Sequence, residues 1–194
     1  MGTITHAADV SKIFANTNLA AAGGVVTAVI LMQIFFKKID VTMALNGALA
    51  GLVAITAEPL APTAFESIII GGIGGAIVVF TVPLLDKFKI DDVVGAIPVH
   101  LFAGIFGTLV VAINTAKEIT LDDGTVETVY TFSASQLGVQ ALGVVSIGAF
   151  IFVISFIIWT LMKMTIGVRV SEEEEMKGLD MSEVGVPAYP EFTN

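Results

Sequence analysis

Cysteine is absent from this 194-residue sequence, and only 14% of the residues are charged. Without cysteine the chain can form no disulfide, no thiolate nucleophile and no thiolate metal site. The sequence has nine Lys and Arg and 18 Asp and Glu, and its basic residues form no cluster. Because a nucleic-acid partner requires clustered basic residues to neutralise its phosphates, such a partner is not expected. A Ser/His/Asp set, an HExxH motif and a phosphate-binding glycine loop are also missing. We therefore expect no enzyme activity and no metal or cofactor.

Apolar residues are abundant, at 55% of the sequence with a mean hydropathy of +0.91. A helix crosses the ~30 Å hydrocarbon core of a bilayer with roughly 20 apolar residues. Five nearly uncharged stretches approach or exceed that length, over 14–36, 41–57, 67–85, 93–116 and 134–163. They predict an all-α integral membrane protein with about five transmembrane helices. In this prediction 14–167 forms the bundle, 1–13 an external stub and 168–194 a cytosolic tail.

Positive charge is distributed unevenly between the two sides of a five-span arrangement. One side receives Lys37, Lys38, Lys87, Lys89, Lys163, Arg169 and Lys177, and the other receives only Lys12 and Lys117. Lys and Arg are retained in the cytoplasm during membrane insertion. The pattern predicts a multi-pass protein of the cell membrane, with its N-terminus outside and its C-terminus in the cytoplasm.

Two local patterns add detail to this topology. The loop 117–130 carries Asp122, Asp123 and Gly124 between β-branched residues, which predicts a small external hairpin. Small residues also recur four positions apart, a spacing that lets helix backbones approach closely in lipid. These pairs are Gly47 with Gly51, Gly71 with Gly75, and Ala103 with Gly107. The pairs predict tight helix packing, but channels, transporters and passive assembly subunits share this feature.

His100 is an ionisable residue in the middle of the uncharged stretch 93–116. An ionisable side chain at membrane depth is costly, so it marks a candidate functional site. At 3.6 residues per turn, Ala103, Gly104 and Gly107 share its side of a helix. This spacing predicts that the imidazole faces a closely packed or narrow space.

Three further residues are expected to support this helix. Pro98 has no backbone N–H, so a helix through this point leaves the Val94 carbonyl without its usual partner and loosens the turn below His100. Asp92 lies where a carboxylate can cap free N–H groups at the helix start. Asn46, in the second span, is expected to make an interhelical hydrogen bond.

Three roles are open for His100. It can be a hydrogen-bonded contact between helices. A haem or metal ligand would need a partner, and the other histidine, His6, belongs to the polar N-terminal segment, which argues against a site within one chain. A proton or substrate relay suits a buried neutral imidazole, because one nitrogen can donate a hydrogen bond while the other accepts one.

Two long strings resemble the ammonium transporter (Amt/Mep/Rh) family. They are NGALAGLVAITA over 46–57 and DDVVGAIPVH over 91–100. The tail, with GVRVSEEEE from Gly167 and then Gly178, Leu179 and Asp180, is similar to the cytosolic C-terminus of that family. The resemblance covers the chain from about Ile13 onward.

The resemblance implies an eleven-helix fold, built from two inverted five-helix halves and a final long helix, with three subunits that each enclose a pore. This chain corresponds to the last five helices. His100 matches the second of two neighbouring pore histidines, and Asp92 matches the acidic residue near the start of its helix. The implied substrate is ammonium, which is deprotonated so that ammonia passes the histidines. Residues 178–180 lie in the tail, which in this family can dock a PII-type signalling protein.

Several parts of the implied pore belong to helices outside this sequence. They include the other pore histidine, the outer aromatic site and the phenylalanine gate, and Phe14 does not match a gate residue. The first expectation is therefore a transport half that conducts ammonia only when completed, as a homotrimer in the membrane lipid. The alternative is a non-conducting assembly or regulatory membrane subunit that associates with intact transporters.

Overall fold

The computed structural model describes residues 4–121 and 124–192, and it divides into two compact units. Unit 1 comprises Met1–Ser146 and unit 2 comprises Ile147–Asn194. Unit 1 contains the helices α1 (Ile4–Phe35), α2 (Val41–Ile55) and α3 (Ala64–Lys87), then a π-helix η1 (Ile97–Phe102) that continues into α4 (Ala103–Val110). Two strands follow, and they lead into α5 (Ala134–Thr165), which crosses from unit 1 into unit 2.

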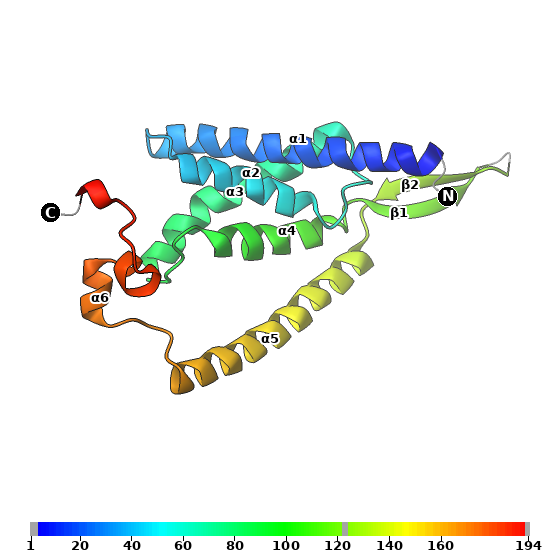
Figure 1. Ribbon diagram of the computed structural model, residues 1–194. Helices are drawn as coiled ribbons and strands as arrows, with labels where there is room; N and C mark the ends of the chain where they lie inside the picture. The colour runs from blue at the N-terminus through cyan, green and yellow to red at the C-terminus, as the bar shows by residue number, and fades with distance from the viewer. Residues whose placement is uncertain (1–3, 122–123, 193–194) are drawn as a thin grey trace. The chain divides into compact units, whose positions relative to one another are not determined.

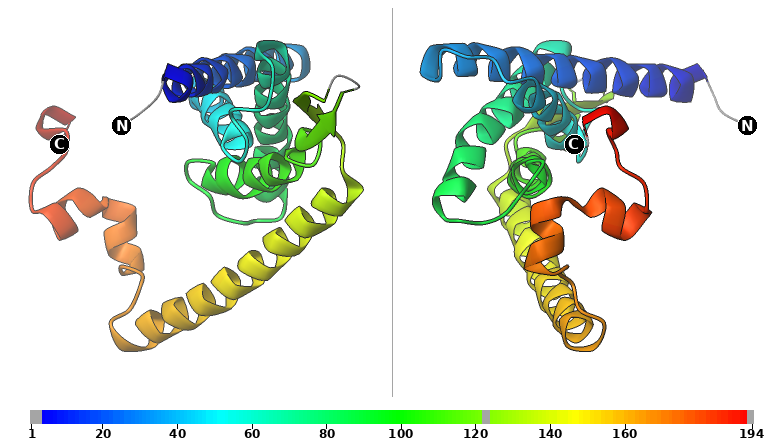
Figure 2. Two further views of the ribbon diagram at one scale, coloured as in Figure 1. Left: turned by 90° about the vertical axis from the view of Figure 1, so that its right-hand side faces the viewer. Right: turned by 60° about the vertical axis from the view of Figure 1, so that its left-hand side comes forward.

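The core of unit 1 lies where α1, α2 and α3 pack against one another and where α2 and α3 meet η1 and α4 (Figures 1 and 2). Small side chains dominate its buried apolar residues, which include Ala20, Ala28, Ala50, Ala54, Val78, Val79, Val99 and Ala103. Large apolar side chains point outward instead, such as Phe80, Leu101 and Ile113. This inverted distribution is what a lipid environment permits, because hydrocarbon does not drive large apolar groups inward.

Glycines bring the helix backbones of unit 1 into direct contact. A Cβ on Gly71 would overlap the backbone of Ala20 in α1. A Cβ on Gly107 of α4 would lie 2.5 Å from the carbonyl oxygen of Ala54 in α2, closer than any real side chain approaches. The tight packing that the small-residue pairs predicted is therefore confirmed.

Side-chain caps define where α2 and α3 begin. The Asp40 carboxylate accepts a hydrogen bond from the Met43 N–H at 2.8 Å at the start of α2. Thr63 and Glu66 form a reciprocal capping box at the start of α3. Both caps satisfy N–H groups that a helix leaves without internal partners.

Three of these helices are long and apolar enough to cross a membrane among the described residues: His6–Phe35, Ala64–Lys87 and Ala134–Thr165. α1 already begins at Ile4, so the described residues of the predicted external stub 1–13 are helical and continuous with the first span. The prediction of one long helix over 93–116 was wrong, since the helical part runs only from Ile97 to Val110. That helix and α2, which ends at Ile55, are shorter than a full span.

The predicted hairpin is present. Strand β1 (Thr115–Thr120) pairs antiparallel with β2 (Val126–Thr131), with Thr115 opposite Thr131 (Figure 1). Gly124 adopts a φ of +81°, a backbone conformation that glycine tolerates best. Asp122 and Asp123, which helped to predict the turn, lie outside the described residues.

The predicted last span, 134–163, corresponds closely to α5, whose 32 residues end at Thr165. Unit 2 continues with α6 (Glu172–Lys177), a π-helical turn η2 (Asp180–Val184) and a short 3-10 helix η3 (Pro190–Phe192). The predicted tail 168–194 thus contains three short helical segments joined by irregular residues.

Candidate functional site

The segment before His100 is anchored by Asp92. Its two carboxylate oxygens accept hydrogen bonds from the N–H groups of Ala96 and Ile97, at 2.9 and 2.8 Å. Pro98 has no N–H, and the Val99 N–H donates to the Gly95 carbonyl at 3.3 Å. All donors of the first helical turn are therefore accounted for, and Asp92 satisfies two of them.

Pro98 does not interrupt a helix, contrary to the sequence interpretation. It lies in the first turn, where its missing N–H removes no helical hydrogen bond. Val94 precedes the helix, and its carbonyl accepts a hydrogen bond from the side-chain amide of Asn46 on α2 at 2.7 Å. The side chain of Asn46 therefore bonds the segment just before η1 to α2, whereas the sequence predicted a hydrogen bond between two helices.

The turn that carries His100 is a π-helix. The Ala103 N–H donates to the Pro98 carbonyl, five residues back, so the turn is wider than in an α-helix. Val99 and Ala103 are buried, at 1% and 0% exposure, whereas His100 is exposed in this chain. His100 thus lies off the buried face that Val99, Ala103 and Gly107 form.

The prediction that the imidazole of His100 faces a closely packed or narrow space stays a prediction, because His100 is exposed among the described residues. The prediction assumed 3.6 residues per turn, and the π-turn breaks that register between His100 and Ala103. Gly104 is half-buried, and a Cβ there would meet only Val53 at an ordinary 3.7 Å. Single-turn π-helices inside membrane and soluble helices frequently coincide with functional sites, a signal that helical periodicity in the sequence does not carry.

A hollow of about 260 Å³ with both polar and apolar lining residues opens beside the residues that precede η1. Its lining includes the carboxylates of Asp40, Asp86 and Asp92 and the side chain of Asn46. Asp40 and Asp92 already accept backbone N–H groups, and no group of His, Asp and Glu in the described part of the chain could hold a metal ion. Sequence reasoning missed Asp40 and Asp86, although both stand at the ends of apolar stretches.

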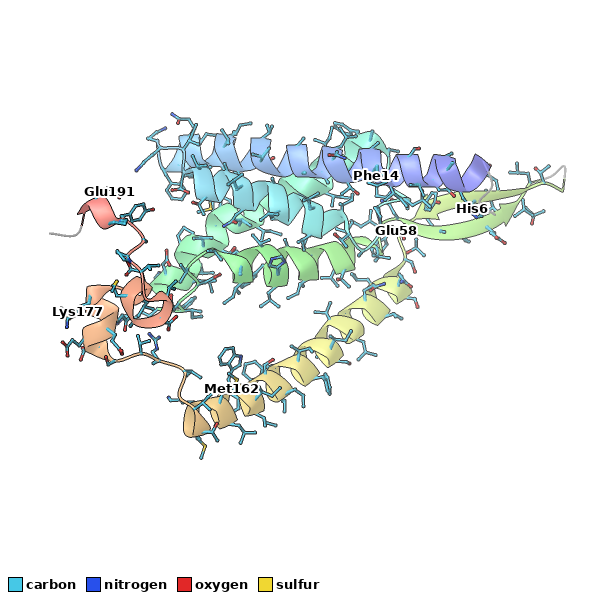
Figure 3. The ribbon with its side chains drawn as sticks, in the orientation of Figure 1. His6, Phe14, Glu58, Met162, Lys177 and Glu191 are labelled. Carbon is cyan, nitrogen blue, oxygen red and sulfur yellow. The ribbon has the colours of Figure 1, made fainter. Side chains whose placement is uncertain are left out.

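The two histidines do not form a common site. Figure 3 shows His6 on the first turns of α1, at the end of unit 1 where the hairpin lies. η1 and α4 form one continuous helix, and η1 is the end of that helix that lies away from the hairpin (Figure 1).

Residues 178–180 of the predicted regulatory tail lie between α6 and η2. Gly178 has a φ of +93°, Leu179 precedes η2, and the Asp180 carboxylate accepts the Ala188 N–H at 2.8 Å. At the start of α6, hydrogen bonds from the hydroxyl and the N–H of Ser171 hold the pKa of Glu174 below its ordinary value. The tail thus has a defined local structure.

The capping role of Asp92 leads to a stability prediction. We expect Asp92→Ala to lower the free energy of unfolding by about 1–2 kcal/mol, because two N–H groups lose their acceptor. Asp92→Asn keeps one acceptor oxygen and should lower it less. Thermal unfolding in detergent measures both variants. Equal stability of wild type and Asp92→Ala would contradict the cap.

Comparisons with a family profile and with individual known proteins both identify ammonium transporters as relatives of this chain. The sequence profile of the Ammonium Transporter Family matches residues 1–189. The chain is 41% identical to "Ammonium transporter Amt2" of Archaeoglobus fulgidus, over 96% of this chain and 41% of that protein. It is 34% identical to the "Ammonium transporter" of Bacillus subtilis, over 91% of this chain and 43% of that one.

Solved structures agree with these sequence relatives. The chain superposes on a structure titled "Sensor Amt Protein" with a TM-score of 0.76 and 33% identity, covering 90% of this chain and 42% of that one. Mep2 of Candida albicans matches with a TM-score of 0.70 and 29% identity, over 93% and 42% of the two chains. The chain therefore spans about two fifths of the length of these relatives. With its apolar helices and this match over nearly its whole length, it is a multi-pass membrane protein that belongs to the ammonium transporter family.

Proposed function

We propose that this chain supplies the second half of an ammonium transporter and conducts ammonia when the N-terminal helices of such a transporter complete it. The observation that supports this proposal most strongly is the exposed imidazole of His100 within an apolar helix. Facing hydrocarbon, an ionisable side chain would be costly, so further helices or a water-filled passage should cover it. The chain's length, about two fifths of its relatives, leaves room for such helices.

The chemistry of the cargo explains why a histidine suits this position. An ammonium ion loses its hydration in a low-dielectric passage, whereas neutral ammonia avoids most of that cost. Deprotonation at the entry requires a group that can accept or pass on a proton. The imidazole of His100 can accept a hydrogen bond with one nitrogen and donate one with the other, and it forms one part of the proton route in this proposal.

The same proposal includes the arrangement in the membrane. The three long helices cross the membrane, and α2 and the η1–α4 helix, each shorter than a full span, cross it together with their flanking residues. The N-terminus lies outside and the C-terminus in the cytoplasm in this proposal, because most Lys and Arg fall on one side. The completed protein forms a homotrimer with one passage per subunit. The tail, with Gly178, Leu179 and Asp180, faces the cytoplasm and is the surface for a PII-type signalling protein.

Uptake of labelled methylammonium tests the proposal. Cells that lack their own ammonium transporters would express this chain alone, the N-terminal helices of a family member alone, or both. We expect uptake above background only when both are present and both reach the membrane. Absence of uptake in the third strain, with both parts shown to be assembled, would contradict conduction and favour a non-conducting assembly or regulatory subunit.

A further inference from the structure

Asn46 connects α2 to the segment that leads into the histidine-bearing turn. Asn46 is 9% exposed, and its side-chain amide donates to the Val94 carbonyl at 2.7 Å. Gly95, the next residue, has a φ of +74° and lies directly against this amide, because a Cβ there would come within 2.6 Å of the Asn46 nitrogen. The side chain and the turn thus fit together without space for a larger residue at 95.

Two side chains, here called the clamps, therefore hold consecutive residues of the same turn by hydrogen bonds. Asn46 holds the Val94 carbonyl, and Asp92 holds the N–H groups of Ala96 and Ile97. The π-turn starts from this fixed point and closes five residues later, where Ala103 donates to Pro98. The clamps define the position at which the wide turn begins. That position decides which residues face the buried side and which are turned away from it.

We propose that Asn46 is a positioning residue for His100: its amide fixes the start of the π-turn and thereby the direction in which the imidazole points. The relevance of this role for conduction rests on the proposed function. The geometric role itself does not, because it concerns the orientation of a ring within this chain. A donor is required at position 46, since the Val94 carbonyl can only accept.

Asn16 provides a matched control within the same bundle. It is also a buried asparagine, at 2% exposure, and its amide donates to the carbonyls of Pro59 and Pro62 at 2.9 and 2.8 Å. These carbonyls belong to the connection between α2 and α3 and not to the turn before His100. Asn→Asp at either position keeps the side-chain shape and removes the donor. Both variants should therefore lose stability, but only one should alter the π-turn.

The test compares Asn46→Asp with Asn16→Asp in the full chain, in lipid nanodiscs, with His6→Gln so that His100 is the remaining histidine. The ring signals of isotope-labelled His100 report the orientation and surroundings of the imidazole. Hydrogen exchange of the Ala103 N–H reports the π-turn. We expect Asn46→Asp to shift the ring signals and to speed this exchange about tenfold, the factor expected when a buried hydrogen bond is lost. Asn16→Asp should leave both unchanged in the folded protein.

Transport by the completed assembly adds a second readout. Asn46→Asp should reduce the maximal methylammonium uptake per assembled molecule, whereas Asn16→Asp should reduce only the amount of assembled protein. Unchanged ring signals and Ala103 exchange in folded Asn46→Asp would overturn the positioning role, and so would equal changes in both variants. If the spectroscopic changes occur but the wild-type assembly takes up no methylammonium, the positioning role stands and the proposed function fails.

Discussion

His100→Ala is expected to abolish ammonium and methylammonium uptake by the completed assembly. The substitution removes the one ionisable side chain in the helix formed by η1 and α4 and leaves an apolar surface that can neither accept nor donate a proton. Loss of a proton-transferring group commonly lowers a rate by about a hundredfold or more. The effect should therefore exceed that of any change that only loosens packing nearby.

The measurement is uptake per assembled molecule in proteoliposomes that contain the chain and its N-terminal complement. His6→Ala is the matched control, because it removes the other histidine from the first turns of α1 (Figure 3). We expect His6→Ala to retain wild-type uptake. Wild-type uptake in His100→Ala would reject a role for the imidazole in conduction, even if the family fold is correct.

Gly71→Ala is expected to prevent correct packing of α1 on α3. The added Cβ would overlap the backbone of Ala20, and backbone atoms cannot move aside as the end of a flexible side chain can. Overpacking a well-packed core typically costs about 1–3 kcal/mol and occasionally more, and a backbone overlap belongs at the upper end. The whole interface of α1 with α3 would have to separate to relieve it.

Gly138→Ala in α5 is the control for this substitution. A Cβ at Gly138 meets nothing within 4 Å in this chain. Replacing this glycine with alanine therefore causes no overlap and only raises the intrinsic preference of the residue for a helix. Thermal unfolding in detergent, with the yield of monodisperse protein, compares the two variants. We expect a large loss of both for Gly71→Ala and no loss for Gly138→Ala. Equal behaviour of the two variants would contradict the close approach of α1 and α3.

Hydropathy in the sequence predicted helices close to α3 and α5, because charged residues bound both apolar stretches. The hairpin was predicted by the turn-forming residues of the loop 117–130. Hydropathy failed for the helix after α3. Residues 93–96 are as apolar as a helix, yet Gly95 with its positive φ and the Asp92 cap delay the helix start to Ile97. At the other end, the apolar run after Val110 continues into β1. Apolar character alone does not distinguish these conformations.

The sequence singled out residues that the structure places around the start of η1, but it did not predict their hydrogen bonds. Asp92, Asn46 and Pro98 were all singled out, since each has an obvious chemical use near a histidine. The hydrogen bond from the Asn46 amide to the Val94 carbonyl depends on how closely α2 and the segment before η1 approach each other. That distance cannot be read from the pattern of a single sequence. The π-turn at His100 was missed because a periodicity of 3.6 residues per turn describes only an α-helix. The spacing of small residues correctly predicted close helix packing, because two helix backbones can touch wherever no large side chain stands between them.

The response of the His100 ring to ammonium tests the central proposal most directly. In the His6→Gln background, the isotope-labelled imidazole of the completed assembly can be followed while ammonium chloride or sodium chloride is added at constant pH. The proposal predicts that ammonium chloride shifts the ring signals of the completed assembly and that sodium chloride does not. Ring signals that stay unchanged by ammonium, in an assembly that still takes up ammonium, would contradict it.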